Sequence, residues 1–267
     1  MRLEALEVGF EIHCEGSRAG DLADSVLAAW DWCLVSGDDG AGPFQQVKVE
    51  LDPGLTTPAR SSGATSLSGH DLPTLMDRLS PLVTRLAVTE RRHDLVMFHA
   101  CAVADPSTGD TVVLYGPSGA GKTTLARTLC TDLIYLSDET AGVAADLRVV
   151  PYFKPLSIIV NPTERLKEQV SPGRLGLVRP GEVGFRLVGL VQLCREPEHR
   201  GDALVESLAT VDALPELMAQ TSYTRDMERP LHRMADLAHR VGGVRRATYA
   251  EAEQLRPVVR AILDGDL

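Results

Sequence analysis

The spacing of apolar residues along the chain distinguishes segments that should form strands from segments that should form helices. A nearly continuous apolar run at residues 95–104 predicts a strand buried on both faces, and the runs at residues 111–115 and 133–137 predict two further strands. Residues 123–130 lie between the last two runs and have the spacing of a helix. A Gly-rich segment connects the second run to this helix, so the pattern predicts the order strand, loop, helix, strand.

The same periods extend towards both ends of the chain and predict an α/β fold. Strands interleaved with helices favour this class, and strands that follow one another directly favour a mixed sheet. Further strands are expected at residues 8–13, 45–51, 156–160, 185–194 and 244–249, and further helices at residues 22–34, 72–86, 211–219, 229–241 and 250–263.

A stretch rich in Pro, Gly, Ser and Thr at residues 52–69 separates two parts of the chain. Its composition and its low apolar content are typical of an exposed linker. We therefore expect a small α+β N-terminal unit at residues 1–70, linker included. The larger domain at residues 71–267 contains the Gly-rich segment.

The Gly-rich segment from Gly116 to Thr123 matches the phosphate-loop (P-loop) pattern G-x-x-x-x-G-K-[ST] at every required position. Its glycines allow a tight bend whose N–H groups converge on phosphates. Lys122 is expected to reach the β- and γ-phosphates, and Thr123 to offer its hydroxyl to Mg²⁺. The residues expected to bind the nucleotide are Gly116, Pro117, Ser118, Gly119, Ala120, Gly121, Lys122, Thr123 and Thr124.

Two carboxylates, Asp138 and Glu139, follow directly after the strand at residues 133–137. Open α/β sheets place their ligands at this end of their strands. One carboxylate can hold Mg²⁺ while the other acts as a base. The alternative is a polar strand end without a chemical role.

His99 lies inside the apolar run at residues 95–104. A histidine in such a run is most often a core residue with one satisfied ring nitrogen. Its position shortly before the P-loop also makes it a candidate for the site.

The composition narrows the partners and the compartment. A formal net charge of −10 argues against a general nucleic-acid binder, which needs a basic surface. The five cysteines include no C-x-x-C pair, so neither a zinc site nor a disulfide framework is indicated. The first residues are unlike a signal peptide, and no apolar run approaches the length of a membrane span. We expect a cytoplasmic protein with no nucleic-acid and no membrane partner.

Four segments, in this order and at this spacing, resemble the kinase domain of the HPr kinase/phosphorylase superfamily. The likeness extends over roughly residues 90 to 250 and is strongest to the HPr kinase-related proteins of biosynthetic gene clusters. Some of these proteins phosphorylate ribosomally made peptide precursors such as lasso peptides. The segments are residues 98–103, 116–123, 136–139 and 153–157.

The resemblance implies that the P-loop binds ATP, that Thr123 and Asp138 hold Mg²⁺, and that His99 assists catalysis. The acid/base aspartate of the family is the second member of its acidic pair, and Glu139 stands there in this chain. Which of the two carboxylates takes the proton stays open, as does the reverse phosphorolysis. Lys154 is a further candidate for contact with the substrate or the transferred phosphate, and an exposed cation before a proline is its alternative. A homo-oligomer is left open.

Three functions fit these patterns. The first is an ATP-dependent kinase that phosphorylates a serine or another hydroxyl of a peptide or small protein, such as a ribosomal peptide precursor. The second is a small-molecule kinase for an amino acid or a sugar. The third is an ATP-binding assembly or regulatory module without catalysis, in which residues 1–70 hold a partner. The Gly/Pro-rich residues 165–184 are expected to influence the choice of acceptor without revealing it.

Overall fold

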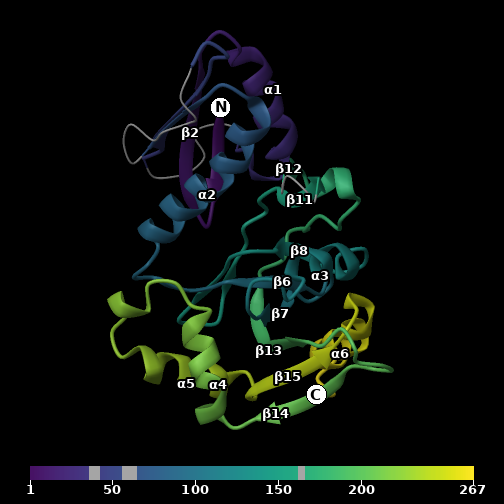
Figure 1. Ribbon diagram of the computed structural model, residues 1–267. Coiled ribbons are helices and arrows are strands. Elements are labelled where there is room, and N and C mark those ends of the chain that lie inside the picture. The colour runs from purple at the N-terminus through teal and green to yellow at the C-terminus, as the bar shows by residue number, and fades with distance from the viewer. Residues whose placement is uncertain (36–42, 56–64, 162–165) are drawn as a thin grey trace. The chain divides into compact units, whose positions relative to one another are not determined.

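The chain forms two compact units (Figure 1). The computed structural model describes residues 1–35, 43–55, 65–161 and 166–267. The first unit comprises Met1–Arg91 and Phe153–Leu175, and the second comprises Arg92–Tyr152 and Gly176–Leu267.

This division differs from the boundary that we expected after residue 70. α2 (Leu72–Glu90) packs on β4 (Ser66–Gly69) and on β12 (Leu166–Val170), and both of these strands belong to the first unit. The buried residues of α2 recur on one helical face, and Pro81 does not interrupt the helix. The helix after the linker therefore completes the core of the first unit.

The first unit is built on a four-stranded mixed sheet in the order β1-β2-β3-β4. β1 and β2 are antiparallel, whereas the β2–β3 and β3–β4 pairs are parallel. Residues 66–69 of the expected linker form a strand, and residues 56–64 lie outside the described residues. The remaining elements of the unit are β1 (Arg2–Ala5), β2 (Val8–Glu15), α1 (Ala19–Ala29), the 3₁₀ turn Asp31–Cys33, β3 (Gln45–Leu51), the β11 (Leu156–Asn161)–β12 hairpin and the 3₁₀ turn Gly173–Leu175.

The second unit contains a six-stranded mixed sheet in the order β14-β15-β13-β7-β6-β8. β7, β13 and β15 are parallel to one another, while β6 runs antiparallel to both β7 and β8. The mixed sheet therefore confirms the expected α/β class. The strands are β6 (Ala100–Ala104), β7 (Asp110–Tyr115), β8 (Ile134–Ser137), β13 (Arg186–Arg195), β14 (Leu204–Leu208) and β15 (Val244–Tyr249).

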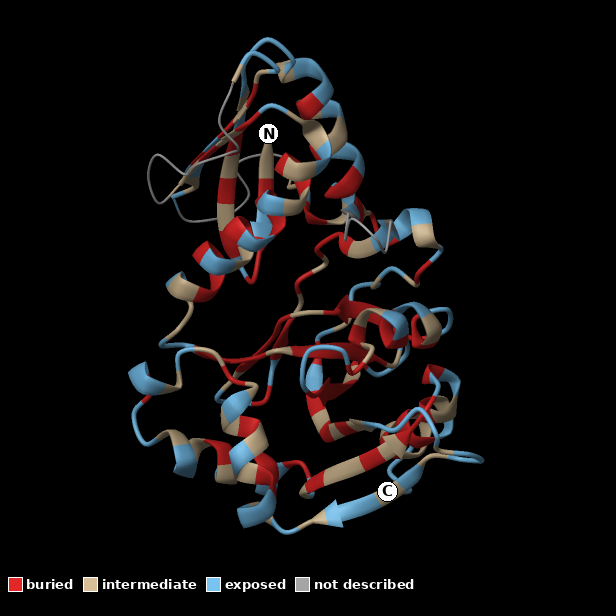
Figure 2. Ribbon diagram, in the orientation of Figure 1, coloured by how far each residue is buried: buried red, intermediate tan, exposed pale blue. Residues whose placement is uncertain are grey.

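The core of the second unit lies along β6, β7 and β8, which Figure 2 shows mostly in the colour of buried residues. α3 (Lys122–Leu129) packs on β6, and α6 (Arg256–Leu263) packs on β7 and β13. A Cβ at Gly189 of β13 would lie 2.5 Å from Ile262 Cγ2, so glycine is what allows α6 to approach this face closely. Two further helices, α4 (Thr210–Ala219) and α5 (Pro230–Arg240), pack against each other.

The apolar run at residues 95–104 forms two strands where we expected one. β5 (Leu95–Phe98) pairs with β9 (Ala141–Ala144) in a three-stranded sheet, whereas β6 belongs to the six-stranded sheet. The strand is interrupted at His99, whose N–H donates to the Gln220 carbonyl at 2.7 Å. The expectation of His99 in mid-strand was therefore wrong, because a main-chain bond from a distant segment interrupts the ladder there.

The other differences concern short elements and helix ends. The helix expected at residues 22–34 ends at Ala29, and the one expected at 250–263 divides into the 3₁₀ turn Ala252–Leu255 and α6. No helix among the described residues is long and apolar enough to cross a lipid bilayer. The strands that the pattern did not predict are β1, β4, β9, β10 (Val149–Val150), β12 and β14.

Candidate active site

The Gly-rich segment connects the carboxyl end of β7 to the first residue of α3. Gly119 and Gly121 both have φ of +90°, a backbone conformation that side chains with a Cβ rarely adopt. A Cβ at Gly116 would lie 3.0 Å from Leu193 Cβ, so the loop begins in close contact with β13. The three glycines of the pattern thus occupy positions where the local geometry favours glycine.

Lys122 folds back over this loop. Its Nζ donates hydrogen bonds to the carbonyls of Gly116 at 2.7 Å and Pro117 at 3.1 Å, and the residue is 8 % exposed. Burial lowers the pKa of this ammonium, while nearby acidic groups such as Asp138 oppose the shift. The positive charge is therefore held within the loop that the motif assigns to phosphates.

The P-loop and the acidic strand end meet through one hydrogen bond. Thr123 Oγ1 donates to Asp138 Oδ2 at 2.7 Å, and the Tyr135 hydroxyl donates to the other carboxylate oxygen at 3.1 Å. Asp138 is 4 % exposed, and these two hydroxyls fix the orientation of its carboxylate. Burial and the Asp138 charge raise the pKa of Tyr135, which keeps this hydroxyl a donor. Sequence patterns gave no indication of Tyr135, an ordinary aromatic residue in an apolar strand.

Glu139 and His99 lie together on the same side of the P-loop. The Glu139 carbonyl accepts hydrogen bonds from Ala100 N–H and from His99 Nδ1, both at 3.1 Å. Because a carbonyl only accepts, Nδ1 carries a proton, and a neutral ring then leaves Nε2 as an acceptor. Burial and the Lys122 charge lower the pKa of His99 below its usual value of 6.5, which favours that neutral form. The Glu139 side chain is partly exposed.

The residues present fit a nucleotide with Mg²⁺. Ideal Cβ atoms at Gly119 and Gly121 would meet nothing within 4 Å, so the space above the loop is open. The Thr123 hydroxyl and the Asp138 carboxylate are hard oxygen ligands of the kind that Mg²⁺ prefers. No group of three or more His, Cys, Asp or Glu side chains in the described part of the chain is placed to hold a metal. Mg²⁺ at nucleotide sites takes one or two protein ligands and completes its shell with phosphates and water.

A hollow of about 630 Å³ opens on the other side of the P-loop, and we call it the loop hollow. Its lining includes residues 117–120, Gln192 of β13, Arg246 of β15, and the pair Glu216 and Gln220 at the end of α4. Gln220 Nε2 donates to Glu216 Oε1 at 3.0 Å. Sequence reasoning missed these four polar residues, because no motif connects them and only the sheet register brings them together.

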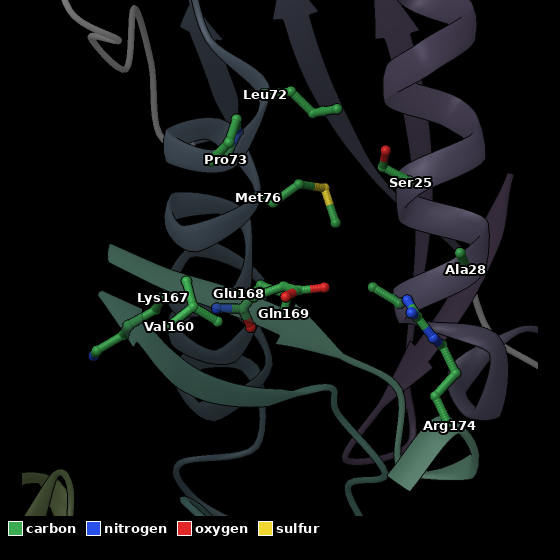
Figure 3. A pocket seen from close by; sticks show the side chains of 11 residues that line it. Ser25, Ala28, Leu72, Pro73, Met76, Val160, Lys167, Glu168, Gln169 and Arg174 are labelled. Carbon is green, nitrogen blue, oxygen red and sulfur yellow. The ribbon is translucent and has the colours of Figure 1, made fainter. Parts of the chain in front are cut away.

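The first unit has a hollow of its own, of about 370 Å³ (Figure 3). Met76 of α2 extends into the space beside α1, and most of the surrounding surface is apolar. The buried polar group of its lining, the Gln169 amide, is satisfied by hydrogen bonds with Ser157 and Asp77. We assign this hollow no chemical role.

Lys154 lies in the first unit, whereas the other candidate residues lie in the second. It is 1 % exposed, and its Nζ donates to the Pro155 carbonyl at 3.1 Å. In this conformation its ammonium is buried.

Comparisons with known proteins add little. No family model matches the sequence, and no curated protein matches it. One solved structure with a likeness is the Hpr(Ser) kinase/phosphatase from Coxiella burnetii, with a TM-score of 0.33 and 10% identity. The likeness covers 64% of this chain and 95% of that chain. Such a low TM-score carries no argument about fold or function, so the proposals rest on the residues of the site.

Proposed function

We propose that the chain is an ATP-dependent kinase that transfers the γ-phosphoryl group to a hydroxyl of a peptide or small protein. The observation that carries this proposal is the 2.7 Å hydrogen bond between Thr123 and Asp138. It joins the P-loop to the acidic strand end, so a phosphate cradle and a pair of carboxylates belong to one site. Phosphoryl transfer depends on positioning and charge neutralisation, which these groups can provide.

The binding half of the site consists of the loop, Lys122 and the Thr123–Asp138 pair. The loop N–H groups and Lys122 orient the phosphates and balance their charge. Thr123 and Asp138 would hold Mg²⁺, which supplies further neutralisation of charge on the transferring group. Tyr135 positions Asp138 through the second carboxylate oxygen.

The reacting half of the site consists of Glu139 and His99. Asp138 is buried and accepts hydrogen bonds from two hydroxyls, whereas Glu139 is partly exposed, on the side of the acidic pair that solvent and an acceptor can reach. We therefore assign Asp138 to the metal and Glu139 to the proton. His99 positions Glu139 by donating from Nδ1 to its main-chain carbonyl. Its Nε2 can then accept a hydrogen bond from the substrate that receives the phosphoryl group.

The proposed transfer requires no reactant besides ATP and the acceptor hydroxyl. The acceptor hydroxyl oxygen forms a bond to the γ-phosphorus as the bond to the β–γ bridging oxygen breaks, and that electron pair leaves with ADP. The hydroxyl proton moves to the Glu139 carboxylate, which releases it to water afterwards.

The test is phosphoryl transfer from γ-labelled ATP in the presence of Mg²⁺. Serine-containing peptides encoded beside the gene, free serine and a simple sugar serve as acceptors, and release of labelled phosphate is measured in parallel. The variants are Lys122→Met and Glu139→Gln. Lys48→Met and Glu228→Gln are matched controls, because both residues are exposed and neither lies at the site.

Label on a peptide that is lost in both site variants and kept in both controls is the expected result. Label on free serine or the sugar alone would replace the acceptor in our proposal by a small molecule. Binding of ATP without any transfer or hydrolysis would overturn the kinase assignment in favour of a non-catalytic module.

A further inference from the structure

The loop hollow lies over the strands on one side of the P-loop. Tyr115, Gln192 and Arg246 are direct partners across the parallel strands β7, β13 and β15, so their side chains leave the same face of the sheet. Gln192 is three positions from Gly189, whose face α6 covers, so this row lies on the opposite face. Glu216 and Gln220 approach the same hollow from α4.

The polar groups of this row are poorly satisfied by the protein. Gln192 Oε1 and the Tyr115 hydroxyl are buried and have no hydrogen-bond partner among the described residues. Arg246 is partly exposed, and its guanidinium makes no hydrogen bond or salt bridge with the part of the chain that the structure describes. A buried polar atom without a partner costs about 1–3 kcal/mol, so apolar side chains would give a more stable protein here. A ligand that supplies the missing partners accounts for the polar row.

The charges of the hollow act on the buried Tyr115 hydroxyl. Burial raises the pKa of Tyr115, the Glu216 carboxylate raises it further, and the Arg246 charge opposes the shift. Glu216 and Arg246 thus both act electrostatically on the hydroxyl of this row. The lining of the hollow thus offers amide, carboxylate and guanidinium groups to a ligand.

The position of the hollow selects among ligands. In the six-stranded sheet, β13 and β15 lie on one side of β7, while β6 and β8 lie on the other. The candidate metal and base groups are on the β6–β8 side, where the γ-phosphate would have to lie. A triphosphate bound in the loop then has its other end directed towards β13 and β15, at the carboxyl ends of parallel strands where α/β sheets bind ligands.

We infer that the loop hollow binds the nucleoside part of the nucleotide, with Gln192 and Arg246 as residues that recognise it. The inference rests on the proposed function, because it assumes phosphates in the P-loop. A base and a ribose both present hydrogen-bond donors and acceptors, which complement amide, carboxylate and guanidinium groups. The hollow meets the reacting half at Gln220, whose carbonyl accepts from His99 N–H. A peptide acceptor bound in the hollow would therefore leave the Kd for ATP unchanged in the hollow variants, which separates it from a nucleoside.

Calorimetric titration with two ligands tests this inference. Mg²⁺-ATP carries a nucleoside, and Mg²⁺-tripolyphosphate carries the phosphates alone. The variants are Arg246→Met and Gln192→Leu, with Arg200→Met as the matched control on an exposed loop. Removal of the buried Gln192 oxygen is expected to keep or raise the unfolding midpoint, so a weaker binder can be recognised as folded.

We expect each hollow variant to raise the Kd for ATP about tenfold, and to leave the Kd for tripolyphosphate within about twofold of wild type. Arg200→Met should change neither constant. Equal weakening of both ligands, or no weakening of ATP, would overturn the nucleoside assignment. Lys122→Met distinguishes the underlying proposal: if that variant leaves the binding of both ligands unchanged, the phosphate site itself is wrong and the inference falls with it.

Discussion

The two sides of the P-loop differ in how completely the protein satisfies their polar groups. On the β6–β8 side, both oxygens of Asp138 accept hydrogen bonds from hydroxyls, and His99 Nδ1 donates to a main-chain carbonyl. On the β13–β15 side, Gln192 Oε1 and the Tyr115 hydroxyl have no partner among the described residues. The polar groups beside the same loop therefore form a satisfied hydrogen-bond network on the β6–β8 side and include unsatisfied groups on the β13–β15 side.

This difference in hydrogen-bond satisfaction indicates which task each side of the loop can perform. Chemistry at a phosphate requires groups that are already fixed in the productive geometry, because reorganisation during the reaction slows it. Recognition of a nucleoside tolerates groups that become satisfied only on binding. The satisfied side is thus suited to the metal and the base, and the unsatisfied side to the part of the substrate that does not react.

The largest effect on the rate of phosphoryl transfer is expected when Glu139 and Asp138 are each replaced by the corresponding amide. Glu139→Gln should lower the rate of transfer by about 10²–10⁴-fold with little change in the Kd for Mg²⁺-ATP, because it removes only the proton acceptor. Asp138→Asn should also raise the Mg²⁺ concentration required for half-maximal activity. Steady-state kinetics at varied Mg²⁺ distinguish the two. The roles would have to be reversed if Glu139→Gln shifted the Mg²⁺ requirement and Asp138→Asn did not.

The next largest effect concerns the free energy of unfolding, compared between a hydrogen-bonded side chain and a buried one without a partner among the described residues. Tyr135→Phe removes one of the two hydroxyls that bind Asp138 and should lower the free energy of unfolding by about 1–3 kcal/mol. Gln192→Leu removes a buried oxygen that has no partner among the described residues, and should leave the free energy of unfolding unchanged or raise it. Urea denaturation of both variants measures the contrast. A destabilised Gln192→Leu beside a neutral Tyr135→Phe would contradict the distinction between the two sides.

Much of the fold could be predicted from the sequence where the determinants are local. Glycines at fixed spacing, a β-branched run before them and a helical period after them predict strand, loop and helix without reference to the rest of the chain. The acidic pair follows from the next apolar run in the same way. The second unit confirms these elements within one or two residues at their ends.

Features that depend on distant segments could not be predicted. The break at His99 is set by the carbonyls of Gln220 and Glu139, which no local period reveals. The polar row of the loop hollow exists only because β13 and β15 are paired in one particular register. One interpretation of Lys154 from the sequence is an exposed cation before a proline, yet the residue is 1 % exposed in the structure. In each case a long-range contact overrides the local pattern.

The smallest effect concerns the pH dependence of the satisfied side. The pKa of His99 is lowered in the folded protein, so between that lowered value and 6.5 the unfolded chain binds a proton that the folded chain does not. The free energy of unfolding should therefore fall as the pH drops through this window. His99→Gln should reduce that slope, by less than about 1 kcal/mol in total, because a full unit of pKa shift corresponds to about 1.4 kcal/mol and the ring is partly exposed.

Urea titrations at several pH values in this window measure the slope, and His93→Gln is the matched control because His93 is exposed. The control should leave the slope of wild type intact. A slope that His99→Gln leaves unchanged would mean that the ring is equally free to take up a proton in both states. His99 would then be charged beside Lys122 at moderately acidic pH, and Nε2 could not serve as the acceptor that the proposed site assigns to it.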